Sequence, residues 1–194
     1  GGEHCMDDTF YSLIGGGSEN CMLGNSYSTI LGGQDHCMVN SDRSFIASGE
    51  LNSVCEGSQN AIITGTTNLI SGSTSNSIIG GGCQNSISGS AGTKHNAFIG
   101  AGLNNIIDAC NSFIGAGTQN TASSDNSSIV GGENNTVVAL SQYSSILGGS
   151  NNTSSAVYST ILGGEYNEVA NPYTLIGGGE RNKITGSSDY SSIV

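Results

Sequence analysis

Several residue types that ordinary globular domains use freely are scarce in this chain. Its 194 residues include no tryptophan, one proline (Pro172) and only 10% charged residues, against 31 glycines. Such a composition fits neither an ordinary globular enzyme nor a segment kept disordered by its charge. Lys and Arg together number 4 and Asp and Glu 15, which gives a formal net charge of -11. An acidic surface repels nucleic acid and anionic membranes, so we expect neither as a partner.

The chain also lacks a long hydrophobic run and a signal peptide. No apolar stretch approaches the roughly 20 residues that a membrane-spanning helix requires, so we expect no membrane insertion by this segment. Both residue 1 and Val194 fall inside a repeat. We therefore interpret the sequence as part of a longer chain whose targeting and anchoring segments lie elsewhere.

What the sequence does contain is a strict repeat. An isoleucine is followed three residues later by glycine and three residues after that by asparagine, and this frame returns about every sixteen residues. The isoleucines are Ile14, Ile30, Ile46, Ile62, Ile79, Ile99, Ile114, Ile129, Ile146, Ile161, Ile176 and Ile193. Asparagine is replaced within the frame only by His36. Fixed spacing of this kind predicts coils that stack on one another, because a disordered chain has no reason to keep isoleucine in phase.

The pattern within one coil predicts two strands. We number each coil from the position two before the isoleucine, which is serine in most coils, so that isoleucine is position 2, glycine 5 and asparagine 8. Positions 0 to 3 alternate as a strand, glycine 5 makes a tight turn with an expected positive φ, and a second strand follows at 8 to 11. Position 10 is apolar in most coils, as at Met22 and Val137, and should face the isoleucine inside a narrow coil.

These observations predict an all-β fold. We expect a parallel β-solenoid, or β-roll, of about twelve coils of roughly 15 to 17 residues that forms one continuous domain over residues 1–194. The spacing between the asparagine and the next coil varies, which is typical of a surface loop. The longest such insertion, between Gly89 and Asn96, should bulge outward and display Lys94 and His95.

Positions 1 and 3 exchange bulk from coil to coil. A large residue at position 1 accompanies glycine or alanine at position 3, as in Phe113 with Gly115, whereas a small residue at position 1 accompanies an aliphatic one, as in Ser128 with Val130. We interpret this compensation as a close-packed surface between copies of the chain, with contact to another part of the same chain as the alternative. The predicted contact residues are Leu13, Leu31, Phe45, Ile63, Ile78, Phe98, Phe113, Val130, Leu147, Leu162 and Leu175.

Two further columns have a structural interpretation. Position −1 holds tyrosine or asparagine in most coils, as at Tyr158 and Asn126, and such residues can form stacked rings and amide ladders along the solenoid axis. The asparagines at position 8 should be buried and should donate hydrogen bonds to the neighbouring coil.

The six cysteines all lie in the first 110 residues, and they are Cys5, Cys21, Cys37, Cys55, Cys83 and Cys110. Cys5, Cys21 and Cys37 share position 9, where adjacent coils place Cα atoms about 4.8 Å apart, within the range that a disulfide accepts. Three alternatives stay open for them: axial or intermolecular disulfides, free thiols, or a metal site with neighbouring histidines. Strand alternation weighs against the metal, because histidine at position 8 and cysteine at position 9 point to opposite faces.

Catalysis finds little support in the sequence. His4, His36 and His95 lie far apart, and no serine, cysteine or carboxylate recurs beside one of them in the manner of a catalytic triad. Acidic residues are scattered or fall at turns, as Glu165 does, and no Gly-Lys-Ser/Thr follows a glycine run. We assign no catalytic, cofactor-binding or metal-binding residue, and we expect no enzyme and no cofactor.

The repeat resembles two families of trimeric fibrous proteins. Serine, isoleucine, glycine, asparagine and a small or apolar residue, as at Ser112, Ile114, Gly117, Asn120 and Ala122, are similar to the YadA-like head repeat of trimeric autotransporter adhesins. They also resemble the shafts of trimeric tail-fibre proteins that carry endosialidase-type chaperones. The resemblance covers the whole chain. It implies a left-handed β-roll with three chains side by side, located on a cell or virion surface and used for attachment.

The sequence thus favours a structural or adhesive fibre segment that is extracellular, at the surface of a cell or a virion. Its partner would be further copies of the chain, with a surface receptor or glycan as a second partner. The alternatives are a carbohydrate-binding or carbohydrate-active viral tail spike and an ice-binding solenoid. Ice binding would require a regular threonine face, but Thr29, Thr160 and Thr174 share no common column.

Overall fold

The structure is a computed structural model that describes residues 2–89, 95–186 and 189–194, and its regular secondary structure is entirely β-strand. Contacts divide the chain into two compact units, Gly1–Gly102 and Leu103–Val194, each of which is described by itself. None of the described residues forms a helix that is long and apolar enough to cross a membrane.

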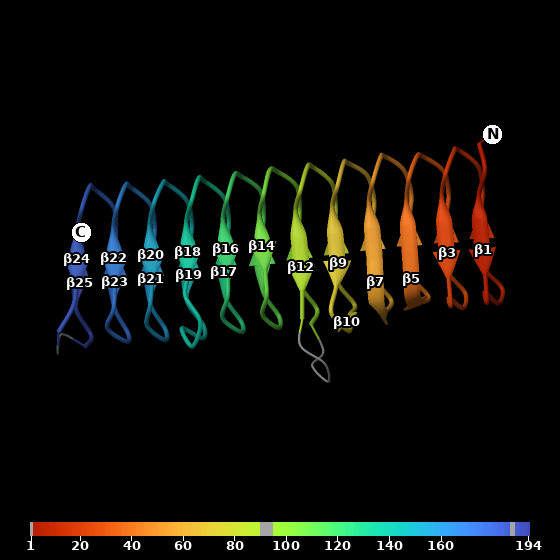
Figure 1. The fold of residues 1–194 in the computed structure, drawn as a ribbon. Coiled ribbons are helices and arrows are strands. Elements are labelled where there is room, and N and C mark those ends of the chain that lie inside the picture. Colours follow the sequence, from red (N-terminus) through yellow and green to blue (C-terminus); the bar gives the residue numbers. More distant parts are fainter. Residues whose placement is uncertain (1, 90–94, 187–188) are drawn as a thin grey trace. The chain divides into compact units, whose positions relative to one another are not determined.

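In the N-terminal unit each coil contributes a strand to each of two parallel sheets (Figure 1). Strands that begin directly after position 8 form the asparagine sheet, in the order β1 (Cys5–Asp7), β3 (Cys21–Leu23), β5 (Cys37–Asp42), β7 (Ser53–Ser58), β9 (Leu69–Ser71) and β12 (Ser86–Ser88). A short extra strand, β10 (Thr74–Ser75), pairs with β7. Strands that carry the isoleucine form the isoleucine sheet, in the order β2 (Leu13–Ile14), β4 (Thr29–Ile30), β6 (Phe45–Ile46), β8 (Ala61–Ile62), β11 (Ile78–Ile79) and β13 (Phe98–Ile99).

The C-terminal unit repeats this plan with shorter strands (Figure 1). Its asparagine sheet has the order β14 (Ile106–Ile107), β16 (Thr121–Ala122), β18 (Thr136–Val137), β20 (Thr153–Ser154), β22 (Glu168–Val169) and β24 (Lys183–Ile184). Its isoleucine sheet has the order β15 (Phe113–Ile114), β17 (Ser128–Ile129), β19 (Ser145–Ile146), β21 (Thr160–Ile161), β23 (Leu175–Ile176) and β25 (Ser192–Ile193).

Equivalent residues of successive coils are paired in register. Ile30 pairs with Ile46 in the N-terminal unit, and Ile114 pairs with Ile129 in the C-terminal unit. Because residues at the same position of successive coils are paired, the columns read from the sequence are columns in space. The predicted parallel β-solenoid is therefore confirmed in each unit.

The core of each coil lies between the two sheets. Isoleucine at position 2 and the apolar residue at position 10 are fully buried, as at Ile46, Met38 and Val137, each 0% exposed. The coil is so narrow that these two rows make up most of its apolar interior. Burying them is the main favourable contribution to folding that a chain with so few large apolar residues can make.

Backbone geometry explains the glycine at position 5. Gly117 has a φ of 107°, and a Cβ built on it would lie 2.2 Å from the carbonyl oxygen of Gly132 in the next coil. Positive φ at this glycine was predicted and is confirmed. The sequence did not predict two further left-handed corners per coil, at positions 7 and −1, where Gln119 has a φ of 56° and Tyr158 one of 55°.

At the C-terminal end of the longest insertion, the exposure of His95 differs from the prediction. Lys94 lies outside the described residues, but His95 is only 2% exposed and is therefore not displayed on the surface. The reason is its place in the coil, because it stands two residues before the buried Ala97 at position 0. His95 thus already belongs to the returning wall of the solenoid.

Candidate functional site

The outer face of the isoleucine sheet carries one large apolar side chain per coil. We call this row the apolar stripe. Its exposed members include Leu31 at 55% and Phe98 at 38% in the N-terminal unit, and Val130 at 52% and Leu147 at 45% in the C-terminal unit. The stripe comprises Leu13, Leu31, Phe45, Ile63, Ile78 and Phe98 in the first unit, and Phe113, Val130, Leu147, Leu162 and Leu175 in the second.

The stripe faces away from the core, as strand alternation requires. Each member stands directly before or directly after the isoleucine of its coil. It nevertheless remains exposed or, as at Phe45 and Leu175, half-buried. Soluble monomers rarely leave a contiguous row of large apolar side chains in water. The surface is therefore the strongest candidate for an interaction site on each unit.

The exchange of bulk between positions 1 and 3 has a cause within the chain. A Cβ added to Gly115 would lie 2.4 Å from the carbonyl oxygen of Val130 and 3.3 Å from the Phe113 ring. The Phe113 ring thus lies close to the glycine of its own coil, and the backbone of the next coil also approaches that glycine. In this coil the compensated volume has a cause within the chain, so the exposure of the stripe is the stronger argument for a partner.

Beside the stripe, position 4 is often glycine, although no steric contact within the chain requires it. A Cβ added to Gly32, Gly148 or Gly163 would meet no atom within 4 Å, and none of these residues has a positive φ. Neither sterics nor backbone conformation requires glycine there. In these three coils the surface directly after the stripe therefore carries no side chain.

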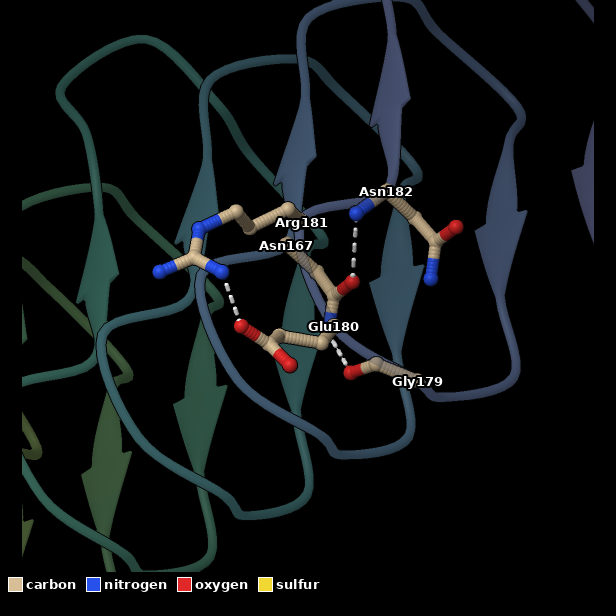
Figure 2. A network of polar contacts seen from close by, with 5 residues as sticks. All are labelled: Asn167, Gly179, Glu180, Arg181 and Asn182. Carbon is tan, nitrogen blue, oxygen red and sulfur yellow. Dashed lines mark hydrogen bonds and ion pairs between the residues drawn. The ribbon is translucent and has the colours of Figure 1, made fainter.

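The asparagines at position 8 form a buried column that joins successive coils. Figure 2 shows two of them in the C-terminal unit, where the backbone N–H of Asn182 donates to Oδ1 of Asn167 at 3.0 Å. The Nδ2 of Asn167 in turn donates to the carbonyl of Gly179 at 2.9 Å. Asn167 thus provides an acceptor for the N–H of Asn182 and a second donor for the Gly179 carbonyl, which also accepts from the N–H of Glu165. These bonds confirm the predicted donation to the neighbouring coil.

Two of the three histidines occupy the same column. The Nδ1 of His4 accepts a hydrogen bond from the N–H of Asn20 at 3.3 Å, and the Nδ1 of His36 accepts one from the N–H of Asn52 at 3.1 Å. Asn20 lies between them, since its Oδ1 accepts from the N–H of His36. These histidines therefore act as hydrogen-bond acceptors for the backbone of the next coil.

Tyrosines at position −1 stack along the solenoid. In the C-terminal unit the rings of Tyr143, Tyr158, Tyr173 and Tyr190 are 4.9 to 5.0 Å apart and parallel within 5°. Each ring therefore covers part of the face of the next, although Tyr158 and Tyr173 within the ladder remain 47% and 48% exposed. A sugar stacks on a ring face, and the ladder therefore suits a structural role better than a row of carbohydrate contacts.

The outer face of the asparagine sheet changes its chemistry between the two units. In the N-terminal unit Cys5, Cys21 and Cys37 are paired in register, as their shared position predicted. In the C-terminal unit Thr121, Thr136 and Thr153 form a threonine column. The sequence reasoning missed this column because it compared threonines at other positions.

Charged groups gather at one turn of the C-terminal unit. Glu165 and Glu180 are paired in adjacent coils, and the Arg181 guanidinium lies over the Tyr166 ring at 5.4 Å from its centroid. Glu180 also forms an ion pair with Arg181 (Figure 2). All four side chains are exposed. No pocket and no convergent group of three or more His, Cys, Asp or Glu side chains was found among the described residues.

Comparison with known proteins leaves these surfaces as the main guide to function. No protein-family model matches the chain. No curated protein matches its sequence.

Proposed function

We propose that this chain is a non-enzymatic structural or adhesive fibre segment that associates with copies of itself through the apolar stripe. The observation that carries the proposal is the exposure of one large apolar side chain per coil on one face of each unit, as at Leu31 in the first and Leu147 in the second. A trimer would bring three such faces together around one axis. The stripe would then become the shared core that each narrow coil lacks by itself.

The glycines at position 4 support the same arrangement. Gly148 and Gly163 stand directly after Leu147 and Leu162, and a side chain at either glycine would meet nothing in its own chain. A neighbouring backbone can approach closely only where no side chain projects. We therefore place the closest approach between chains at this edge of the stripe.

Self-association is tested by removing apolar groups that contribute nothing to the core of the single chain. Leu147→Ser with Leu162→Ser should convert an assembly of three chains into monomers in sedimentation equilibrium, while the circular dichroism of the β-structure is kept. Val138→Ser with Leu140→Ser is the matched control, because these side chains are 38% and 80% exposed but lie outside the stripe. A monomeric parent at micromolar concentration would refute the proposal.

The proposed place of the segment is outside the cell, on a cell or virion surface, where it would act as a stiff shaft or head for attachment. Axial pairing of backbone groups along each unit supports stiffness and resistance to proteases, because few open segments are presented. A receptor or a glycan is the proposed second partner. Binding on a glycan array, compared between the assembled parent and the Leu147→Ser with Leu162→Ser variant, tests whether attachment depends on assembly.

Ice binding is a second candidate because of the threonine column. Thr121, Thr136 and Thr153 are half-buried on a flat sheet, at the axial spacing of about 4.8 Å between strands. The column is short, since Ile106 precedes it and the Glu168–Lys183 ion pair follows it. An ice-recrystallisation assay decides the question: inhibition that is lost in Thr136→Tyr supports ice binding, and an inactive parent excludes it.

A further inference from the structure

A column of cysteine side chains lies on the outer face of the asparagine sheet in the N-terminal unit. We call Cys5, Cys21 and Cys37 the thiol ladder. Met22 and Met38, which directly follow Cys21 and Cys37 in their strands, are fully buried. Because side chains alternate along a strand, the thiols point outward. Cys5 is exposed, and Cys21 and Cys37 are half-exposed free thiols.

In-register pairing fixes how far apart these thiols stand. Cys5 pairs with Cys21 and Cys21 with Cys37, so neighbouring Cβ atoms have the strand spacing of about 4.8 Å and parallel Cα–Cβ directions. A disulfide needs Cβ atoms about 3.5 to 4.5 Å apart and sulfurs about 2.05 Å apart. The ladder is therefore too widely spaced for an unstrained disulfide, although its Cα spacing alone permits one.

The same spacing suits a cation bound between two thiolates. A thiolate sulfur lies about 2.3 Å from zinc, and a soft d10 cation forms bonds of similar length, so two bonds on one line span about 4.6 Å. Thiolate ligands select soft cations such as Cu(I). A tetrahedral site is not supported, since no three His, Cys, Asp or Glu side chains converge among the described residues.

We propose that neighbouring thiols of the ladder bind a soft, two-coordinate d10 cation, with Cu(I) as the physiological candidate. Binding converts two thiols and one cation into a linear S–Cu–S unit and releases two protons. The inference goes beyond the fibre function and does not depend on it, because the ladder and the apolar stripe lie on different sheets.

The surroundings of the ladder favour a cation. Arg43 is the only Lys or Arg among the first 89 residues, whereas Asp7, Glu19 and Asp35 lie within two residues of a ladder cysteine. Each thiol that binds the cation must lose its proton, so binding should tighten as the pH rises.

The ladder also predicts a stoichiometry. Three thiols in a row provide two ligands for one cation and leave one over. Ser53 is the next residue of the column, paired with Cys37, and its side chain is half-exposed. Ser53→Cys would complete a second pair and should raise the capacity from one Cu(I) to two. Cys55 cannot be the second ligand beside Cys37, because the two residues are diagonal neighbours on adjacent strands, a spacing of about 7 to 8 Å.

The test is an anaerobic titration of the reduced full chain with Cu(I) in competition with a chromogenic chelator, followed by native mass spectrometry. The parent should hold one Cu(I) per chain and Ser53→Cys two. Cys21→Ser should weaken binding about 100-fold or more, because Cys5 and Cys37 then stand two strand spacings apart, about 9.6 Å. Cys83→Ser, in another column, should bind like the parent.

Hydrogen exchange of β1 and β3 gives a readout besides stoichiometry, since a bound cation should slow exchange there in the parent and not in Cys21→Ser. Equal affinity in the parent and Cys21→Ser, or no binding at all, would overturn the proposal. A Cys5–Cys21 disulfide in the chain purified in air and resistant to mild reductant would also overturn it, because the pair would then prefer oxidation to metal.

Discussion

The backbone N–H of Asn52 donates a hydrogen bond to Nδ1 of His36 at 3.1 Å, and this contact replaces the one that asparagine makes elsewhere in the column. In the C-terminal unit the N–H of Asn152 donates to Oδ1 of Asn135 at 3.0 Å. The imidazole accepts a hydrogen bond as the asparagine does, but it does not donate one. Its Nε2 is buried and finds no hydrogen-bond partner among the described residues, whereas Nδ2 of Asn135 donates to Gly149.

His36→Asn should therefore stabilise the N-terminal unit. The amide could donate to the glycine carbonyls around it and still accept from Asn52, so a buried donor without a partner would be removed. We expect a gain of about 1 to 2 kcal/mol in the free energy of unfolding. Urea denaturation of the parent and the variant at pH 7.5 measures it, and a variant that is less stable than the parent would contradict this role of the column.

The same residue predicts a loss of stability in acid. Burial lowers the pKa of the His36 imidazole below its ordinary value of 6.5, with the charge of Asp35 acting in the opposite direction. Above pH 6.5 the imidazole is neutral in both the folded and the unfolded chain, and its contribution is fully present. As the pH falls from 6.5 towards the lower pKa of the folded state, only the unfolded chain takes up the proton, so stability decreases.

Melting temperatures at pH 7.5 and 5.5 test this dependence, with His36→Asn as the control. The parent should lose more stability than the variant between the two pH values. An equal loss in both proteins would show that other groups cause the acid sensitivity.

Much of the fold could be predicted from the sequence because the same residue types recur in phase. Isoleucine at position 2 and asparagine at position 8, such as Ile114 and Asn120, have one environment in every coil, so repetition reveals both the burial and the hydrogen bonding. The left-handed corner at position 7 was not foreseen, because its residues vary from Glu19 to Tyr166. The backbone there is imposed by the closed coil and leaves no residue signature.

Parts of the candidate sites also depended on three-dimensional detail. The apolar residues of the stripe were read correctly as outward-facing, and the attribution of the exchange of bulk to a partner chain stays a prediction. The contact between the Phe113 ring and the site of a Cβ on Gly115 shows a cause within one coil. Sequence spacing gave the Cα register of the thiol ladder, whereas the choice between disulfide and cation depends on where the Cβ atoms of Cys5 and Cys21 stand.

The asparagine column should dominate local stability in the C-terminal unit. Nδ2 of Asn135 donates to the carbonyls of Gly131 and Gly149, and its Oδ1 accepts from Asn152. Asn135→Ala would leave the N–H of Asn152 and the carbonyl of Gly131 without these partners, whereas the Gly149 carbonyl would keep its bond from the N–H of Glu133. We expect a cost of about 3 kcal/mol. Asn134→Asp is the matched control, because Asn134 is exposed and aspartate tolerates its φ of 55°. Similar midpoints in urea for the two variants would refute the buried-ladder account.

Leu140 offers a site at which a surface change should stabilise the chain. Its side chain is 80% exposed, and its φ is 68°, a left-handed conformation that a branched residue adopts at a cost. Asparagine occupies this region more readily and already does so at Asn126, with a φ of 57°. Leu140→Asn should therefore add about 1 kcal/mol to the free energy of unfolding. Val138→Asn, at another exposed position but without a positive φ, should give no such gain; if both variants or neither were more stable in urea, the φ of Leu140 would not be the cause.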